Sequence, residues 1–317
     1  MTDYKYSNLL KNCTLCPHKC GANRFRNRKG FCRASDILEI SSILPHYGEE
    51  PPISGSKGSG TIFFNHCNMD CVYCQNYQIS QDCDNLHIKV EHTLKLEDCI
   101  LNLQDLGCHN INLVSPTIWV PHIIDALSTL RSKENGLSIP VIYNSGGYED
   151  SGTIKILEGF IEIYMPDIRY SKNESAYKYS GVKNYVENNR KSLIEMYSQV
   201  GGLKTDENGI ALRGLMIRLL IIPGIADEVK KSLDFIKSEL STDVYISIMS
   251  QYKPLYKALH DPEINRRINR DEYNRIIDYA DKLGFYSGAI QELEEHPEEE
   301  DLFKPDFERD EVFKYKK

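Results

Sequence analysis

From residue 59 onward, short apolar segments alternate with segments whose apolar residues recur at helical spacing. Six short segments read as strands, at 61–65, 111–114, 140–143, 160–165, 215–222 and 244–249. Helices are expected between them, for example where Val120, Ile123, Ile124, Leu127 and Leu130 share one face. This alternation predicts right-handed βαβ units and a parallel sheet, either open and doubly wound or curved into a partly closed barrel.

The chain of 317 residues divides into three expected parts. Residues 1–58 form a cysteine-rich segment, in which 36–58 is expected to be irregular because prolines and glycines interrupt it. Residues 59–290 form the α/β core, with two helices within 173–199 and a glycine-rich loop at 201–209. Residues 291–317 form an acidic tail. In such a core, the polar residues at the carboxyl ends of the strands line the site.

Three cysteines follow the first expected strand with the spacing CxxxCxxC: Cys67, Cys71 and Cys74. Three thiolates on one loop can hold three irons of a [4Fe–4S] cluster, whose usual complement is four thiolates. The missing fourth ligand leaves one iron open to an amino or carboxylate group. The alternative is a zinc knuckle with His66 as its fourth ligand. The spacing, the position after the strand and Tyr73 favour the cluster.

This cysteine motif, with Tyr73 before its last cysteine, resembles that of the radical S-adenosylmethionine (SAM) superfamily. The resemblance covers nearly the whole chain, from about residue 12 to about residue 310. Within the superfamily, the chain looks similar to the branch of pyruvate formate-lyase-activating-enzyme-like proteins. The motifs behind this closer resemblance are Gln75-Asn76-Tyr77, Val114-Ser115-Pro116-Thr117, Tyr143-Asn144-Ser145-Gly146, Tyr164-Met165-Pro166-Asp167 and Met249-Ser250-Gln251-Tyr252.

The resemblance implies an α/β fold, a partial (β/α)6 barrel of the radical SAM type with a small cysteine-rich N-terminal segment. It also implies a [4Fe–4S] cluster on Cys67, Cys71 and Cys74, with SAM bound at the open iron. The activity would be reductive cleavage of SAM to methionine and a 5′-deoxyadenosyl radical, which abstracts hydrogen from a substrate. Flavodoxin or ferredoxin would donate the electron, and an oxygen-sensitive cluster would require an anaerobic setting.

Matching the strand ends to the superfamily assigns SAM-binding positions to particular residues. Tyr73 matches the aromatic residue beside the adenine, whereas Asn144 and Ser145 match positions near the ribose or the methionine carboxylate. Ser115 and Thr117 stand where the superfamily often has Gly-Gly-Glu, so hydroxyl or backbone oxygens would replace the glutamate. The alternative for this last pair is a turn that caps the next helix.

Three further residues complete the expected site. Asp167 ends the fourth expected strand and, with Asn144 and Ser145, could hold a monovalent cation; its alternative role is to cap a helix. Arg218 resembles the superfamily's arginine near the SAM carboxylate, and its alternative is an ion pair with a carboxylate inside the barrel. Gly224 would let the backbone approach the adenine.

Four more cysteines lie in the N-terminal part: Cys13, Cys16, Cys20 and Cys32. Four thiolates complete the coordination of a structural metal site, so zinc or a second iron–sulfur cluster is expected, with a slight preference for zinc. The alternative is a disordered segment with free thiols. Clustered cysteines in a reducing compartment are more often metal ligands.

Charge and hydropathy limit the partners. The formal charge of 38 − 46 = −8 argues against a protein that binds nucleic acid through phosphate contacts. One local basic run, Arg24, Arg26, Arg28 and Lys29, reads as a solvated surface loop. No apolar run approaches the ~20 residues of a membrane span, and the N-terminus has no stretch of signal-peptide type. We therefore expect a cytoplasmic protein with neither membrane nor nucleic-acid partners.

Three functions compete on this evidence. The first is a radical enzyme that activates another protein by making a glycyl radical. The second is a radical enzyme that acts on a small molecule or on a different protein residue. The third is a non-catalytic iron–sulfur or zinc protein used in electron transfer or as a scaffold.

Overall fold

The computed structural model describes residues 6–26, 28–82, 94–293, 304–309 and 311–313. The strands are β1 (Ile40–His46), β2 (Ser59–Phe64), β3 (Ile111–Val114), β4 (Val141–Ser145), β5 (Ile163–Pro166), β6 (Lys204–Thr205), β7 (Ala211–Leu220), β8 (Tyr245–Met249) and β9 (Gly288–Ile290). The α-helices are α1 (Asn8–Lys11), α2 (Pro51–Ser54), α3 (Tyr77–Ser80), α4 (Leu96–Asp105), α5 (Val120–Arg131), α6 (Ser151–Ile156), α7 (Asn173–Ser180), α8 (Tyr185–Val200), α9 (Glu228–Glu239) and α10 (Arg270–Leu283). Short 3-10 helices are η1 (Arg24–Arg26), η2 (Thr117–Trp119) and η3 (Tyr256–His260).

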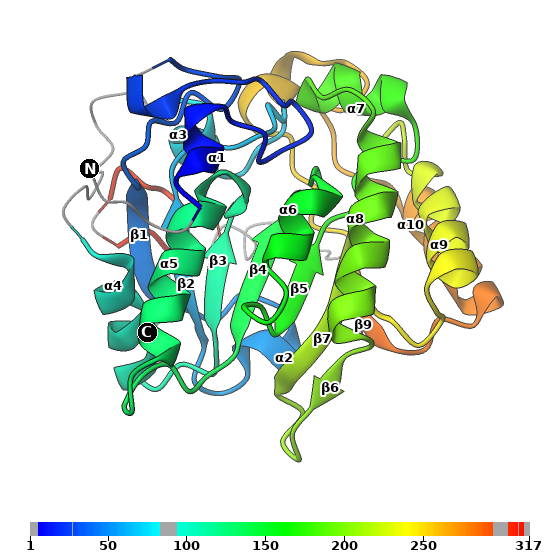
Figure 1. The fold of residues 1–317 in the computed structure, drawn as a ribbon. Coiled ribbons are helices and arrows are strands. Elements are labelled where there is room, and N and C mark those ends of the chain that lie inside the picture. Colours follow the sequence, from blue (N-terminus) through cyan, green and yellow to red (C-terminus); the bar gives the residue numbers. More distant parts are fainter. Residues whose placement is uncertain (1–5, 27, 83–93, 294–303, 310, 314–317) are drawn as a thin grey trace.

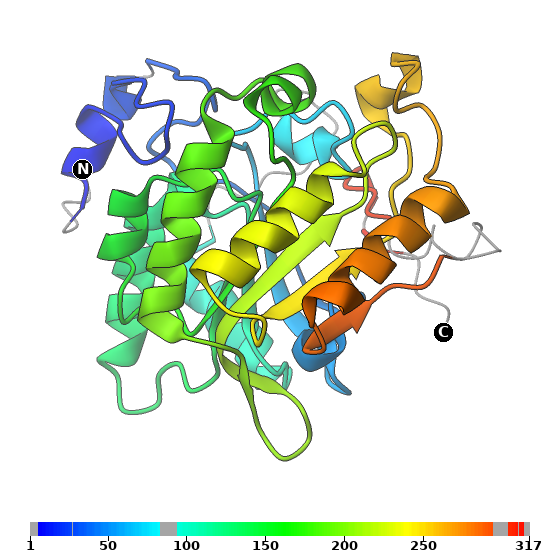
Figure 2. The same cartoon turned by 90° about the vertical axis from the view of Figure 1, so that its right-hand side faces the viewer.

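One sheet organises these elements in the order β1-β2-β3-β4-β5-β7-β8-β9. Every pair from β2 to β9 is parallel, and β1 joins antiparallel at one edge. The long helices cover the outer face of the curved sheet, with α5, α6 and α8 over β3 to β7 in Figure 1 and α9 and α10 beyond them in Figure 2. The inner face therefore encloses a lumen, and the predicted α/β fold with a partial barrel is confirmed.

Apolar packing between the helices and the sheet holds this arrangement together. The strand interiors are almost fully buried, as at Ile62, Leu113 and Ile142, which fits strands covered on both faces. Helix ends follow local chemistry: Asp150 accepts a bond from the Gly152 amide at the start of α6, and Gly284 ends α10 in a left-handed conformation at φ 87°.

Two expectations about the sheet edges are wrong. Residues 36–58 are not irregular throughout, because Ile40–His46 forms β1 and pairs with β2. Pro45 lies in that strand and is tolerated because β1 is an edge strand. At the other edge, the three-residue strand β9 extends the parallel sheet beyond the six strands expected. Three residues that begin with a glycine carry too little periodicity to be recognised.

The glycine-rich loop is also more ordered than expected. Its Lys204–Thr205 forms β6 and pairs antiparallel with the start of β7, which begins at Ala211 instead of 215 and ends at Leu220 instead of 222. Gly214 makes this hairpin possible, because a side chain there would collide with the backbone of Gly202.

Candidate functional site

A cavity of about 610 Å³ opens where the parallel strands end. Its lining includes most of the residues predicted for the site: Cys67, Cys71, Tyr73, Cys74, Ser115, Asn144, Ser145, Asp167 and Arg218. Thr117 and Gly224 are not among the lining residues. The carboxyl ends of parallel strands meet at one edge of a sheet, which explains why residues so far apart in the sequence converge here.

The cysteine loop is fixed by backbone hydrogen bonds to distant segments. The amides of Asp70 and Val72 donate to the carbonyls of Ser180 and Tyr179, each over 2.9 Å, so the loop lies against the end of α7. The amide of Ala258 in η3 donates to the Val72 carbonyl over 2.8 Å. The loop therefore depends on the barrel for its shape, and its thiols are placed at the mouth of the cavity.

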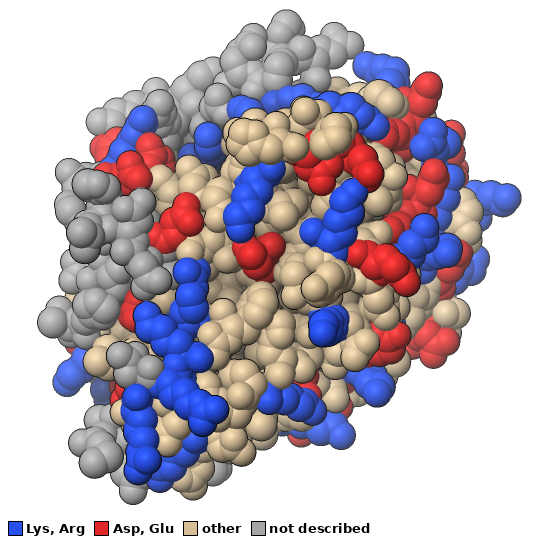
Figure 3. Space-filling view, turned by 90° about the horizontal axis from the view of Figure 1, so that it is seen from above, with Lys and Arg blue, Asp and Glu red and all other residues tan. Residues whose placement is uncertain are grey.

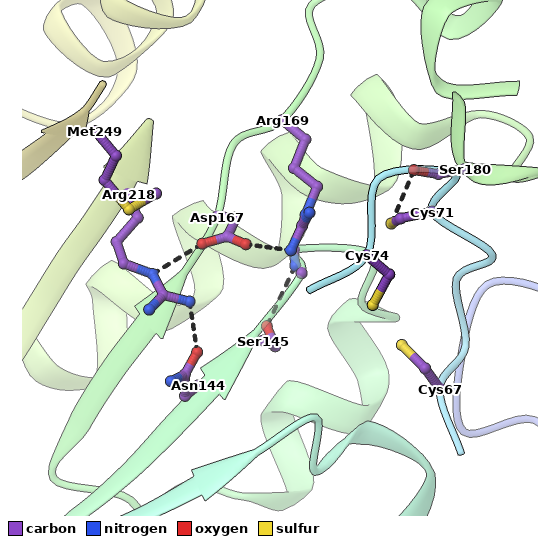
Figure 4. Close-up of polar contacts among 12 residues, drawn as sticks. Cys67, Cys71, Cys74, Asn144, Ser145, Asp167, Arg169, Ser180, Arg218 and Met249 are labelled. Carbon is purple, nitrogen blue, oxygen red and sulfur yellow. Dashed lines mark hydrogen bonds and ion pairs between the residues drawn. The ribbon is translucent and has the colours of Figure 1, made fainter. Parts of the chain in front are cut away.

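Of the three thiols of this loop, Cys71 is buried, and Cys67 and Cys74 are partly buried. Burial raises the pKa of Cys67 to about 12 and that of Cys74 to about 11, and neighbouring thiols add to both shifts. Burial also raises the pKa of Cys71, whose sulfur accepts a 3.0 Å bond from Ser180. Figure 4 shows the three sulfur atoms directed toward a common space. Neighbouring thiols with raised pKa values can lose their protons together only when nearby cations balance the negative charge of the thiolates. Bound irons would supply those cations.

A single metal ion fits these residues less well than a cluster. Among the residues that the structure describes, no three His, Cys, Asp or Glu side chains lie close enough to hold one ion. His66, the candidate fourth ligand of a zinc knuckle, instead places its Nε2 3.2 Å from Glu39 Oε2. A cluster has its own bulk and can bridge thiols that are too far apart to share one ion.

Tyr73 lies in a chain of hydroxyl groups that leads back to the cysteines. Its hydroxyl is 2.6 Å from that of Tyr170, which is 2.6 Å from the Ser180 hydroxyl, the donor to Cys71. Burial raises the pKa of Tyr73, so its hydroxyl is neutral. The ring of Tyr73 packs edge-on against Tyr252 with centroids 5.7 Å apart. This network holds the aromatic face at the cavity wall.

Charged residues from neighbouring strands form the floor of the cavity (Figure 4). Arg218 donates to Asp167 over 2.8 Å and to the Asn144 side chain over 2.6 Å, and its guanidinium lies 3.5 Å from Glu49. Arg169 donates to the second oxygen of Asp167 over 2.6 Å. Nearby carboxylates raise the pKa of Arg218 against the opposing effect of burial, so it stays charged. Arg218 therefore has the ion pair that was its alternative role.

The same contacts bear on the expected monovalent cation. Both carboxylate oxygens of Asp167 and the amide oxygen of Asn144 accept hydrogen bonds from arginines. Only Ser145, whose hydroxyl accepts a 3.3 Å bond from the Gly147 amide, lies outside this arginine network. The oxygens that would ligate a cation thus already face positive charge in this arrangement.

The remaining predicted residues have different neighbours. Ser115 lines the cavity at φ 58°, and its amide donates to the Asn144 carbonyl over 2.9 Å. The Thr117 hydroxyl donates to Glu149 over 2.8 Å, and Thr117 is not among the lining residues. The Gly224 amide donates to Glu272 over 3.3 Å, at φ 79°. Thr117 and Gly224 therefore have structural partners in this arrangement.

Sequence reasoning missed Glu49 as a member of the site. Its carboxylate accepts a 2.9 Å bond from Asn112 and approaches Arg218, so it reaches the lumen from the segment before α2. The acidic pair before Pro51 and Pro52 was the available signal, but nothing in that segment shows that it passes inside a barrel.

The four N-terminal cysteines are separate from this cavity. Cys13, Cys16 and Cys32 are buried, Cys20 is exposed, and none forms a disulfide. None of the four lines the cavity described above.

In the described part of the chain, no helix is both long and apolar enough to cross a membrane. From above, over the strand ends, acidic and basic side chains are interspersed across much of the surface (Figure 3).

Comparison with known proteins places the chain. No family model matches it. The uncharacterized protein MJ0674 of Methanocaldococcus jannaschii is 33% identical over 282 residues, which cover 87% of this chain and 76% of MJ0674. The chain belongs to the same family as MJ0674.

Solved structures resemble the MJ0674-family chain in fold. HydG, a maturase of the [FeFe]-hydrogenase, is 13% identical, with a TM-score of 0.51 over 79% of this chain and 56% of HydG. SuiB of Streptococcus suis, solved with S-adenosylmethionine, is 14% identical, with a TM-score of 0.45 over 75% of this chain and 53% of SuiB. The chain thus spans about half of each. A domain of pyruvate-formate lyase-activating enzyme from Bacteroides vulgatus gives a TM-score of 0.35. The likeness to HydG shows a shared fold, an α/β architecture built on a parallel sheet.

Proposed function

We propose that this chain is a radical SAM enzyme. The observation that carries the proposal is the set of three thiols on one loop that line the cavity, with no fourth thiol among the lining residues that the structure describes. Three thiolates leave one iron of a [4Fe–4S] cluster without a protein ligand, and the cavity supplies space beside it. The shared fold supports the same conclusion.

The chemistry that such a cluster supplies when bound is one-electron cleavage of SAM to methionine and a 5′-deoxyadenosyl radical, which removes hydrogen from a substrate. The protein's own contribution is to position and to shield. The loop places Cys67, Cys71 and Cys74 at the cavity wall, and Arg169 provides positive charge beside Cys71.

The cavity lining supports SAM-binding roles for particular residues. We assign the aromatic wall to Tyr73, and the polar contacts to Ser115, Asn144, Ser145, Asp167 and Arg218. Asp167 and Arg218 form one ion pair, so they act together, with Asp167 orienting the guanidinium. Thr117 and Gly224, which lie outside the lining, would act by supporting the strand ends.

Release of 5′-deoxyadenosine tests the proposal. Protein purified anaerobically and reconstituted with iron and sulfide should release it from SAM after addition of a strong reductant. Cys71→Ala should lose the release and about four irons per chain relative to wild type, because two thiolates cannot hold the cluster. The matched control is Cys99→Ala, a buried thiol in α4 away from the cavity, which should keep both. No release from fully reconstituted protein would show instead a non-catalytic iron–sulfur protein.

The substrate class is a separate question. A glycyl-radical enzyme would have to insert a peptide loop, whereas a small molecule needs only the cavity. Lys304, Pro305 and Phe313 of the C-terminal part border the cavity and narrow its side, which favours the smaller substrate. Transfer of deuterium from a labelled candidate into 5′-deoxyadenosine identifies the hydrogen donor. Support of turnover by flavodoxin or ferredoxin, in place of a chemical reductant, tests the proposed electron donor.

A further inference from the structure

Arg24 is a buried cation that has no anionic partner among the residues that the structure describes. Its residue is 1% exposed, although the basic run to which it belongs reads as a solvated loop. Its Nε donates to the Ser35 carbonyl over 2.7 Å, one Nη donates to the Ile118 carbonyl over 2.5 Å, and its guanidinium lies 4.8 Å from the Trp119 ring. The other Nη has no partner, and no carboxylate of the described residues pairs with Arg24. A buried charge left in this way is costly unless an anion compensates it.

The groups beside Arg24 are the N-terminal thiols. Its charge lowers the pKa of Cys13 and Cys32, although burial outweighs this effect and raises both. The Cys20 sulfur packs against Gly30, two residues before Cys32, since a side chain at Gly30 would collide with it. Cys16 is linked to the same group through Cys32, whose charge raises the pKa of Cys16. Arg24 therefore lies beside Cys13 and Cys32, and the other two thiols neighbour that pair.

The backbone of this segment is turned to bring the thiols together. The Cys13 amide donates to the Ala22 carbonyl, and the Gly21 amide donates back to the Cys13 carbonyl, each over 3.0 Å. Lys19 and Arg33, each next to a cysteine, have φ of 41° and 63°, a conformation that disfavours side chains by about 1 kcal/mol each. Among the described residues of this segment, only α1 and η1, of four and three residues, add regular structure. Apolar packing of Leu10 and Leu15 against the main core adds to these hydrogen bonds, and a metal bound to the thiols would add a further link within the segment.

We propose that Cys13, Cys16, Cys20 and Cys32 bind an anionic metal–thiolate centre and that Arg24 is its buried counter-charge. Four thiolates around Zn²⁺, or around a [4Fe–4S]²⁺ cluster, both carry a net charge of −2, which is the partner that Arg24 lacks. The thiols must draw together on binding, since no three described side chains yet share one ion. The inference stands apart from the proposed SAM chemistry, because it concerns thiols outside the cavity.

The centre would also support the catalytic loop. His18, two residues after Cys16, lies 3.0 Å from the carbonyl of Asn68, the neighbour of Cys67. Arg33, directly after Cys32, donates to the Gln81 carbonyl at the end of the same loop. Metal binding at the N-terminal thiols would therefore fix both ends of the loop that carries Cys67, Cys71 and Cys74.

Metal analysis tests the site without interference from the first cluster. In the full chain with Cys67→Ala, Cys71→Ala and Cys74→Ala, purified anaerobically and reconstituted, we expect about one zinc or about four irons per chain. The element found decides between the two centres. Adding Cys16→Ser should remove this metal, whereas adding Cys108→Ser, a buried thiol elsewhere, should not. Equal metal content in the variants with Cys16→Ser and Cys108→Ser, or no metal in either of them, would contradict the proposed site.

Thiol labelling keeps the test independent of whether these variants fold. The wild-type chain is alkylated in the state in which it is purified and analysed by mass spectrometry. Cys13, Cys16, Cys20 and Cys32 should be protected from the alkylating reagent. A chelator with an oxidant that opens clusters should expose all four, including Cys20, which burial alone does not protect. Labelling of Cys20 at the same rate with and without this treatment would contradict the proposal.

The counter-charge has its own test. Arg24→Gln should release the bound metal to a chelator at least about tenfold faster than wild type, because the anionic centre loses its buried cation. The matched control is Arg26→Gln, an exposed arginine in the same short helix, which should leave the rate unchanged. Equal rates in the two variants would show that Arg24 does not compensate the centre.

Discussion

At the scale of single residues, Glu149 is an acid enclosed by neutral groups. It is fully buried and accepts bonds from Thr117 over 2.8 Å and from Tyr143 over 2.9 Å. Burial raises its pKa from 4.5 to about 7. Because the folded pKa lies above the unfolded one, folding favours the protonated form. The free energy that protonated Glu149 contributes to folding is fully present below pH 4.5. It is lost as the pH rises through about 7, where the buried carboxyl ionises.

Replacing Glu149 by Gln should therefore stabilise the protein at high pH. Gln cannot ionise, so the variant's gain in unfolding free energy should grow from below about 1 kcal/mol at pH 5 to about 3 kcal/mol at pH 8. Urea denaturation at a series of pH values measures it. Glu187→Gln, at an exposed position on α8, should show no such trend. A gain that does not change with pH would mean that Glu149 does not titrate in this range.

Arg218 is the residue on which several buried acids depend. It forms an ion pair with Asp167 and approaches Glu49. Burial raises the pKa of Glu49, and the positive charge of Arg218 opposes part of that rise. Arg218→Leu would leave Glu49 with only the neutral Asn112 side chain and Asp167 with only Arg169, so it should lower the unfolding free energy by about 3–5 kcal/mol at neutral pH. Arg213→Leu, at an exposed position of the same strand, should cost less than about 1 kcal/mol. Adding Glu49→Gln to Arg218→Leu should recover part of the lost unfolding free energy. If it recovers none, the loss does not come from the unpaired charge of Glu49.

At the scale of elements, α10 shows how far local sequence determines structure. Asn269 accepts a 2.8 Å bond from the Glu272 amide, and the Glu272 side chain accepts one from the Asn269 amide over 3.0 Å. Asn269→Ala should therefore cost about 1 kcal/mol of unfolding free energy in chemical denaturation. Asn274→Ala, exposed within the same helix, should instead stabilise slightly, because alanine has the higher helix propensity. Losses of equal size would contradict a capping role for Asn269.

The elements that the sequence predicts well are those with strong local patterns. The central strands and the helices of the core carry an apolar period, and the cysteine spacing marks the loop after β2. The edges were missed because β1 contains Pro45 and β9 has only three residues. Within the site, Glu49 could not be predicted, because its place depends on a segment that enters the lumen. Burial of Arg24 was equally hidden, since it depends on packing against Trp119.

At the scale of the whole molecule, the C-terminal part closes a side of the barrel that the sheet leaves open. Phe307 and Phe313 pack against Phe63 of β2, with ring centroids 5.2 and 6.0 Å apart. Gln78 next to the cysteine loop holds the same part, since the Phe307 amide donates to its side chain over 3.1 Å. This small apolar cluster, completed by Ile79 and Val312, is separate from the main core. It is therefore held by fewer contacts than the strands are.

Removing these two aromatic side chains should open the cavity without unfolding the barrel. In metal-free protein with both Phe307→Ala and Phe313→Ala, a bulky maleimide should label Cys74 at least about tenfold faster. The reason is that the binding of the C-terminal segment to the barrel should weaken by more than about 1.4 kcal/mol. The loss of global stability should stay below the sum of two core Phe→Ala changes, about 6 kcal/mol, since the segment can detach on its own. Tyr177→Ala, an exposed aromatic on α7, serves as the control and should leave the labelling rate unchanged. An unchanged rate in the double variant would mean that reagents reach the cysteines by another route and that this segment does not limit substrate size.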